Sequence, residues 1–243
     1  PDSRETDEFP DPELPETPVR RVVWVKYDWV HFGLVDEQVR LVRADCPLAV
    51  ALGTPAPAQP KMNLKDGAAV VFVPAGDFTM GSDKGKKDEQ PIHNLTLDGF
   101  WIYKYEVTVG QYKKFCAATG RKMPTAPPWG WQDNLPMVNV TFQEAQEYAM
   151  WAGGRLPTEA EWEKAARGND ARKYPWGDTW DVKKCNSLDS GFRKPVAVGS
   201  YPDSASLYGA EDMLGNVFEW CADWYVAAYY WESPKVNPKG PDT

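Results

Sequence analysis

The chain has 243 residues, 42% of them apolar, which suits one large domain or a domain with a small companion. A formal net charge of −8 without any basic stripe argues against nucleic-acid binding, because the phosphate backbone would be repelled on average. All apolar runs are shorter than the roughly eighteen residues that a transmembrane helix needs. Twelve tryptophans and eleven tyrosines indicate either a ligand-binding surface or an irregular, tryptophan-rich core.

The N-terminal region divides into three stretches of different composition. Residues 1–18 carry seven acids, one arginine and five prolines, which predicts an extended tail with too little apolar surface to fold. Residues 19–53 are β-branched and partly alternating, as strands are, whereas residues 53–67 have the proline and turn signals of a linker or long loop. We therefore expect a small β-rich unit over residues 19–67 before a main domain over residues 68–243. The acidic tail favours an extracytoplasmic or cell-surface location, and a plain disordered chain end fits it equally well.

The main domain begins with strand patterns and continues with three helices. AAVVFVPAG, from Ala68, predicts a buried strand that ends at Pro74, and residues 95–109 contain further strand-like runs. Each helix is announced by a capping box, in which a threonine is followed three residues later by Gln or Glu, and each ends at a glycine. The boxes are Thr108 with Gln111, Thr141 with Glu144 and Thr158 with Glu161, and the helices end at Gly120, Gly153 and Gly168.

Residues 169–243 lose regular periodicity and are rich in Gly, Pro, Trp, Asp and Asn. We expect only short strands here, near Pro195–Gly199 and Phe218–Cys221. So long an irregular segment in a compact domain indicates either a functional surface or a segment held in place by something such as a bound ion.

The four cysteines, Cys46, Cys116, Cys185 and Cys221, form no C-x-x-C unit, which argues against a zinc ribbon or a redox motif. Because a free cysteine behaves mainly as a small buried hydrophobe, we expect buried free thiols.

Several long motifs resemble the formylglycine-generating-enzyme-like (sulfatase-modifying-factor) domain family. They are FVPAGDFTMGS from Phe72, FWIYKYEVTVGQYKKF from Phe100, PMVNVTFQEAQEYAMWAGGRLPTEAEWEKAARG from Pro136 and LYGAEDMLGNVFEWCADWY from Leu207. The resemblance runs from about Ala68 to the end of the chain. It implies an α+β, C-type-lectin-like fold with much irregular structure and structural calcium. Members include copper-dependent enzymes that oxidise a sulfatase cysteine to formylglycine, iron-dependent C–S bond-forming enzymes, and non-catalytic display proteins such as the variable proteins of diversity-generating retroelements.

The catalytic residues of these enzymes have no counterpart in the chain. The family's cysteine pair would lie after Thr243, none of the four cysteines matches it, and no copper site is visible. The two histidines, His31 and His93, are too few for an iron cluster. The leading hypothesis is a non-catalytic protein that binds or displays a protein or other macromolecular ligand through its loops, completed by a further C-terminal segment or a second chain. The alternatives are a fragment of a copper-dependent formylglycine-generating oxidoreductase and a structural part of a surface assembly.

Two loops are candidate calcium sites, because both mix side-chain and main-chain oxygens as Ca²⁺ prefers. The first consists of Asp212, Gly215, Asn216, Val217 and Glu219. The second, suggested by the resemblance, consists of Asn186, Ser187, Asp189 and Ser190, although a gap-free match puts Ser190 where an acid is expected. The alternatives are a turn tied by hydrogen bonds at the first loop and a plain polar turn at the second.

Tryptophans in the Pro/Gly-rich loops are weak candidates for lining a ligand site, and they equally suit plugs of an irregular core. These are Trp129, Trp131, Trp176 and Trp180. Trp151 and Trp162 lie on predicted helices and are core candidates. Arg155 is expected to have a structural role, paired with Glu159 or Glu161.

Overall fold

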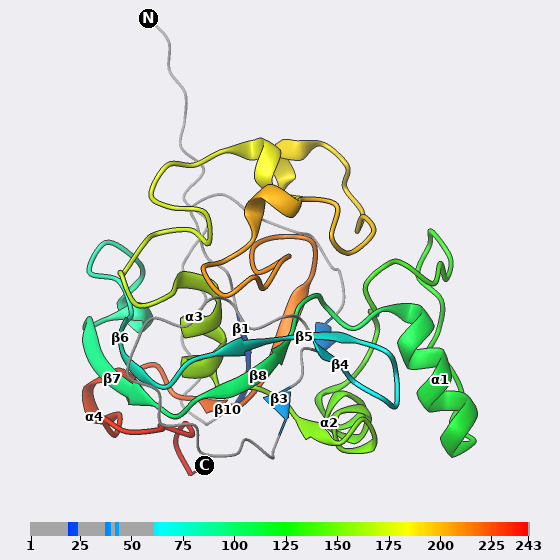
Figure 1. The fold of residues 1–243 in the computed structure, drawn as a ribbon, viewed down its shortest axis with the longest axis horizontal. Helices are drawn as coiled ribbons and strands as arrows, with labels where there is room; N and C mark the ends of the chain where they lie inside the picture. Colours follow the sequence, from blue (N-terminus) through cyan, green and yellow to red (C-terminus); the bar gives the residue numbers. More distant parts are fainter. Residues whose placement is uncertain (1–18, 24–36, 40–41, 44–60, 243) are drawn as a thin grey trace, which may run out of the picture.

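The protein has an α+β fold in which three helices pack around short sheets and long loops complete one end (Figure 1). The computed structural model describes residues 19–23, 37–39, 42–43 and 61–242. The expected tail over residues 1–18, much of the N-terminal unit and Cys46 lie outside these residues. Within them, no helix combines the length and the apolar character needed to cross a membrane.

The strands form one five-stranded, one three-stranded and one two-stranded sheet. The five-stranded order is β4 (Lys61–Met62), β5 (Ala69–Val73), β8 (Phe100–Tyr103), β3 (Val42–Arg43) and β9 (Gly154–Arg155). The three-stranded order is β1 (Val19–Val23), β10 (Phe218–Tyr225) and β2 (Glu37–Val39), and β6 (Gly76–Met80) pairs with β7 (His93–Leu97). β5 confirms the predicted buried strand, because Val71 and Val73 face the core. β6 was not expected as a strand.

The described N-terminal strands pair with strands of the main domain. β1 lies antiparallel to β10 and β2 lies parallel to it, while β3 fits between β8 and β9. β1 and β2 form hydrogen bonds with the two edges of β10. Without them, β10 would present unpaired backbone N–H and C=O groups. Within the stretch predicted as a linker or long loop, β4 folds back on β5 through a turn in which Asn63 Oδ1 accepts from the Lys65 backbone N–H at 2.9 Å. A boundary at residue 67 stays a prediction.

All three predicted helices are present, and each capping box is closed in both directions. The helices are α1 (Val109–Thr119), α2 (Phe142–Trp151) and α3 (Glu159–Arg167). Shorter elements are α4 (Tyr229–Glu232) and the 3-10 turns Lys87–Glu89, Val182–Lys184, Leu188–Ser190 and Pro202–Ser204. At the entry to α3, Arg155 binds both carboxylate oxygens of Glu161, at 2.8 and 2.6 Å, which confirms the predicted pairing.

The core consists of two large clusters of buried side chains. One packs α3 against β5, β6, β7 and β8, and it includes Trp162 and Cys221. The other surrounds α1 and α2, and it includes Cys116, with Trp151 packed at its margin. Cys185 lies in a third, smaller cluster, so the prediction of buried free thiols is confirmed for the three cysteines that the structure describes.

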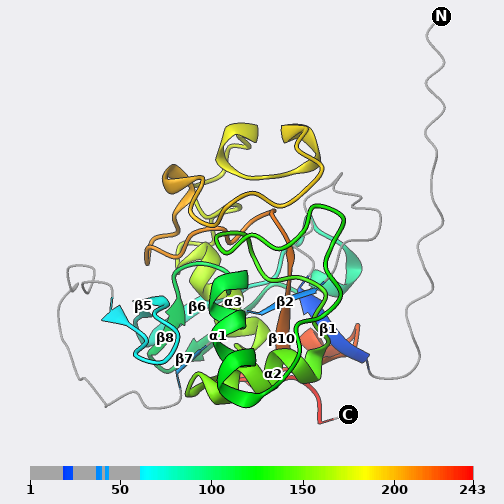
Figure 2. The ribbon, with the colours of Figure 1, turned by 90° about the vertical axis from the view of Figure 1, so that its right-hand side faces the viewer.

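The loops of the C-terminal half gather at one end of the molecule, and both views place α4 and the C-terminus at the opposite end (Figures 1 and 2). The predicted strand at Pro195–Gly199 is wrong, because the N–H and the C=O of Val196 both bind the side chain of Asn216 instead of a neighbouring strand. The other predicted strand exists and is longer than expected, as β10.

Candidate functional site

A buried asparagine holds the loops together. Asn216 has a left-handed backbone, with φ 61°, and its N–H donates to the Asn186 carbonyl at 2.9 Å. Its side-chain Oδ1 accepts from Asn186 Nδ2 at 3.1 Å and from the Val196 N–H at 2.9 Å. Its Nδ2 donates to Glu106 Oε2 at 2.8 Å and to the Val196 carbonyl at 3.3 Å. The close approach needs glycine at position 215, since a Cβ there would lie 2.5 Å from the Asn186 carbonyl oxygen.

The two candidate calcium loops are therefore one connected network. Asn186 Nδ2 also donates to the Lys194 carbonyl at 2.9 Å, and Asn186 Oδ1 accepts from Ser190 Oγ at 2.9 Å. Asn186 and Ser187 are buried, whereas Asp189, the single acid of the second set, is exposed on a 3-10 turn. A set without a buried carboxylate suits a hard cation poorly. This loop fits a polar turn better than a calcium site.

The first set has the better donor chemistry for calcium. Asp212 is 5% exposed and Glu219 is 3% exposed, and they lie at the two ends of one loop. Asp212 Oδ2 accepts from the Gly199 N–H at 2.7 Å, and Glu219 Oε2 accepts from Trp162 Nε1 at 3.0 Å.

The main-chain oxygens of Gly215 and Val217 lie between these acids in the sequence, so the loop can offer carboxylate and carbonyl donors to a hard cation. The amide oxygen of Asn216 is already used by two N–H donors, so Asn216 belongs to the network instead of the donor set. Among the described residues, no three His, Cys, Asp or Glu side chains converge as a metal site. A calcium ion here would therefore depend on the main-chain oxygens.

The outer face of the network forms one wall of a pocket. The pocket has a volume of about 260 Å³. The part of the lining held by Asn186 and Asn216 is the segment 194–197, and a second part of the lining contains Trp129 and Leu135. The Val198 N–H donates to the Asn134 carbonyl at 3.1 Å and joins the two parts. The pocket residues are Trp129, Gln132, Asn134, Leu135, Phe192, Lys194, Pro195, Val196 and Ala197.

Among the predicted tryptophans, Trp129 lines this pocket and the other three do not. Trp131 packs against the α1 and α2 core. Trp176 stacks on Tyr174, with ring centroids 5.4 Å apart and an interplanar angle of 11°, and Trp180 lies 5.5 Å from Tyr174. Sequence reasoning missed Phe192, which is 54% exposed at the pocket. The sequence feature that could have indicated Phe192 is its position as an aromatic residue in the loop segment GFRKP.

The described cysteines are poorly suited to hold a soft metal. They lie in three different clusters. Burial raises the pKa of the Cys116 thiol, and burial raises the pKa of Cys185 to about 11. Copper binds thiolates, so burial of the thiols in separate clusters does not favour a shared copper site among the described cysteines.

The architecture and the connected loops define the class of protein, a formylglycine-generating-enzyme-like domain with a C-type-lectin-like fold. Residues 56–240 match the sulfatase-modifying factor enzyme 1-like domain, and the chain belongs to this family. The formylglycine-generating enzyme of Streptomyces coelicolor is 33% identical over 261 residues, covering 81% of this chain and 82% of that enzyme. Serine/threonine-protein kinase Pkn1 of Chlamydia trachomatis is 36% identical over 195 residues, and the match spans 71% of this chain but 30% of the kinase.

Two solved structures share the fold. PvdO from Pseudomonas aeruginosa has a TM-score of 0.67 and 29% sequence identity, covering 78% of this chain and 84% of that chain. Treponema denticola variable protein 1 has a TM-score of 0.60 with the same coverage. At 19% identity, its likeness concerns the fold alone. The family and the fold implied by the sequence motifs are thus confirmed.

Proposed function

We propose that the chain is a non-catalytic module that binds or displays a protein or other macromolecular ligand at the pocket around Trp129 and Phe192. The observation that carries the proposal is the double hydrogen bond between Asn216 and the backbone of Val196. It fixes one pocket wall before any ligand arrives, and a preorganised wall reduces the entropy lost on binding. Phe192 and Trp129 supply the aromatic anchors that commonly dominate interfaces.

The alternative is the copper-dependent oxidation that gives the formylglycine-generating relatives their name. Support for a non-catalytic role comes from the cysteines, because Cys116, Cys185 and Cys221 are buried in three different clusters. An enzyme of this kind needs thiolates that reach a common metal ion.

Calcium and location complete the proposal. We propose that Asp212 and Glu219, with main-chain oxygens of Gly215 and Val217, hold a structural calcium ion that braces the loop. The support is a pair of buried carboxylates, which are costly to bury unless a cation or hydrogen bonds compensate them. An extracytoplasmic or cell-surface location is proposed from the acidic residues 1–18.

The test is selection of a random peptide library displayed on phage against the immobilised protein. Enriched peptides are expected to lose about tenfold or more in affinity for Trp129→Ala, because truncation of an aromatic anchor commonly costs that much. Trp180→Ala is the matched control, since Trp180 is exposed and lies outside the pocket lining. Failure to enrich any peptide, or equal binding to both variants, contradicts the proposal.

A second assay addresses the alternative. The protein is loaded with copper(I) and incubated in air with a cysteine-containing sulfatase peptide, and the peptide is followed by mass spectrometry. The proposed function expects an unchanged peptide. Conversion of the cysteine to formylglycine refutes the non-catalytic role.

A further inference from the structure

The Trp129 pocket is too small for most small-molecule ligands and has room for a side chain of a partner. Its volume of about 260 Å³ lies below the roughly 300–1,000 Å³ that is usual for small-molecule sites. At its lining, Phe192 is 54% exposed and Trp129 is partly buried. Aromatic rings in such positions favour a large apolar side chain of the partner as the group that enters.

Two side-chain amides at the same pocket suit the main chain of a peptide. Gln132 and Asn134 are both exposed and both line the pocket. Each amide offers an acceptor and two N–H donors, which match the N–H and C=O groups of an extended peptide. The pocket therefore presents apolar contacts and peptide-like hydrogen-bonding groups together.

Positive charge gathers beside this pocket, although the chain as a whole is acidic. Residues 182–199 contain four basic residues and one acid, a formal charge of +3, whereas the whole chain carries −8. Arg193 and Lys194 are exposed, and in the part of the chain that the structure describes no ion pair joins either of them to a carboxylate. The neighbouring acid Asp133 is paired with Lys113 at 2.6 Å. Unpaired cations beside a pocket favour an acidic partner.

The backbone at Arg193 supports a role for its side chain. Its φ of 52° lies in the left-handed region, which is unfavourable for a residue with a Cβ. Residues held in such conformations cluster at functional sites. A charged side chain that is exposed on an unfavourable backbone is therefore consistent with contact to a partner.

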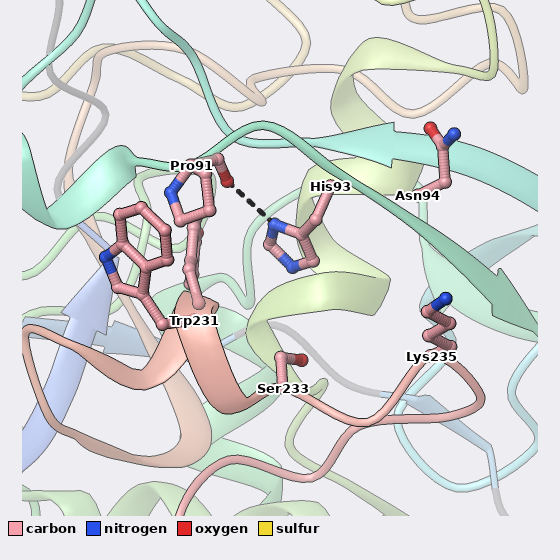
Figure 3. A pocket seen from close by; sticks show the side chains of 7 residues that line it. Pro91, His93, Asn94, Trp231, Ser233 and Lys235 are labelled. Carbon is pink, nitrogen blue, oxygen red and sulfur yellow. Dashed lines mark hydrogen bonds between the residues drawn. The ribbon is translucent and has the colours of Figure 1, made fainter.

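Another pocket, of about 360 Å³ between β7 and α4, does not combine these features in one short segment. Its lining includes Trp231 and Lys235, but Figure 3 shows these two side chains on opposite sides of His93. At the Trp129 pocket, in contrast, Phe192 and Lys194 are only two residues apart in the chain. The β7–α4 pocket therefore supplies control residues of the same types.

We infer that the partner of the Trp129 pocket is an acidic peptide segment in which a large apolar side chain is flanked by Asp or Glu. The apolar side chain contacts Trp129 and Phe192, and the flanking carboxylates face Arg193 and Lys194. This inference rests on the proposed function, because it names the chemistry of the ligand at that same pocket.

The probe is the synthetic peptide Asp-Glu-Phe-Glu-Asp with acetylated and amidated ends, and its dissociation constant is measured by ligand-observed NMR titration. The neutral peptide Asn-Gln-Phe-Gln-Asn lacks the charges, and the alanine peptide Asp-Glu-Ala-Glu-Asp lacks the ring. Each is expected to bind about fivefold more weakly than the acidic probe. Added salt should weaken the acidic probe and leave the neutral peptide nearly unchanged, because salt screens exposed charges.

The double variant Arg193→Asn with Lys194→Gln should weaken the acidic probe about fivefold and leave the neutral peptide unchanged. Asparagine is the replacement at position 193 because it tolerates the left-handed backbone. The matched control is Lys235→Gln with Lys239→Gln, which removes two exposed lysines away from the Trp129 pocket and should leave binding unchanged. Trp129→Ala should weaken both phenylalanine peptides, and Trp231→Ala should weaken neither.

The inference is overturned if the acidic probe does not bind, if the neutral peptide binds as tightly, or if the two double variants bind the probe equally. Loss of binding in Trp231→Ala would assign the probe to the β7–α4 pocket and also overturn it. A failure here is distinguishable from a failure of the proposed function. If library peptides depend on Trp129 but carry no acids, only the acidic partner is wrong, whereas library binding that does not depend on Trp129 refutes the pocket itself.

Discussion

Asn216→Ala is expected to destabilise the protein and to loosen the wall of the Trp129 pocket. The substitution removes the amide that bridges Glu106 Oε2, Asn186 Nδ2 and both backbone groups of Val196. Glu106, Asn186 and at least one backbone group of Val196 would each lose a hydrogen-bond partner. Each loss is expected to cost about 1 kcal/mol or more of the free energy of unfolding. Alanine also tolerates φ 61° less well than asparagine, at about 1 kcal/mol. The expected loss in the free energy of unfolding is about 4 kcal/mol, a large part of the stability of a typical domain.

The matched control is Asn237→Ala. Asn237 also has a left-handed backbone, with φ 46°, and its side chain bonds Asp98 twice, at 2.8 and 2.9 Å. Those bonds are exposed, so water replaces them and the expected cost is about 1–2 kcal/mol. Both variants carry the backbone penalty, and the difference between them isolates the buried network.

Urea unfolding measures the two costs, and hydrogen exchange at the Val196 amide measures the pocket wall. Exchange at Val196 should accelerate in Asn216→Ala and stay unchanged in Asn237→Ala. If the two variants cost the same, or if Val196 keeps its protection without the Asn216 side chain, then the network does not hold the loop and the reasoning is refuted.

Three further predictions address stability elsewhere in the fold. Burial lowers the pKa of Lys164 to about 8 from 10.5, so the unfolded chain binds more protons between those values and the free energy of unfolding should rise with pH across that window. The rise, at most about 3 kcal/mol, should be absent from Lys164→Met when urea unfolding of both proteins is compared at each pH. Tyr103 and Tyr148 both donate to Asp66 Oδ2 at 2.6 Å, so each Tyr→Phe should lower the free energy of unfolding by about 1–3 kcal/mol. Because the two hydroxyls share one acceptor, their effects should be coupled, and additive costs in a double-mutant cycle would contradict this. If calcium binds the first loop, chelation should lower the melting temperature of the wild type and leave Asp212→Asn unaffected; equal melting with calcium and with chelator counts against the ion.

The helices were predictable because their signals are local. A threonine and an acid three residues apart, such as Thr158 and Glu161, satisfy each other's backbone donors without help from the rest of the fold. β5 was predictable for a similar reason, since a run of β-branched residues that ends at Pro74 strongly favours a strand. Recognition of the family motifs then supplied the overall fold, which local signals alone do not determine.

The loop site was only partly predictable, because its contacts join distant residues. Asn186 and Asn216 are 30 residues apart, and each was assigned to a different candidate calcium site. Nothing in the local sequence indicates that one side chain binds the other. The misassigned strand at Pro195–Gly199 has the same origin. Its alternating valines resemble a strand, but the backbone N–H and C=O of Val196 bind the side chain of Asn216.

The polar network also explains how this domain can hold long loops without regular structure. A β-ladder fixes each residue through its neighbours, whereas in this chain one asparagine fixes Val196 through both of its backbone groups. The side chains of Phe192 and Lys194 take no part in those bonds and line the pocket. Residues that face the pocket are therefore free to change without loss of the scaffold, while Asn216 and Gly215 are not. This separation of a fixed support from an adaptable surface is the property that a ligand-binding or display module requires.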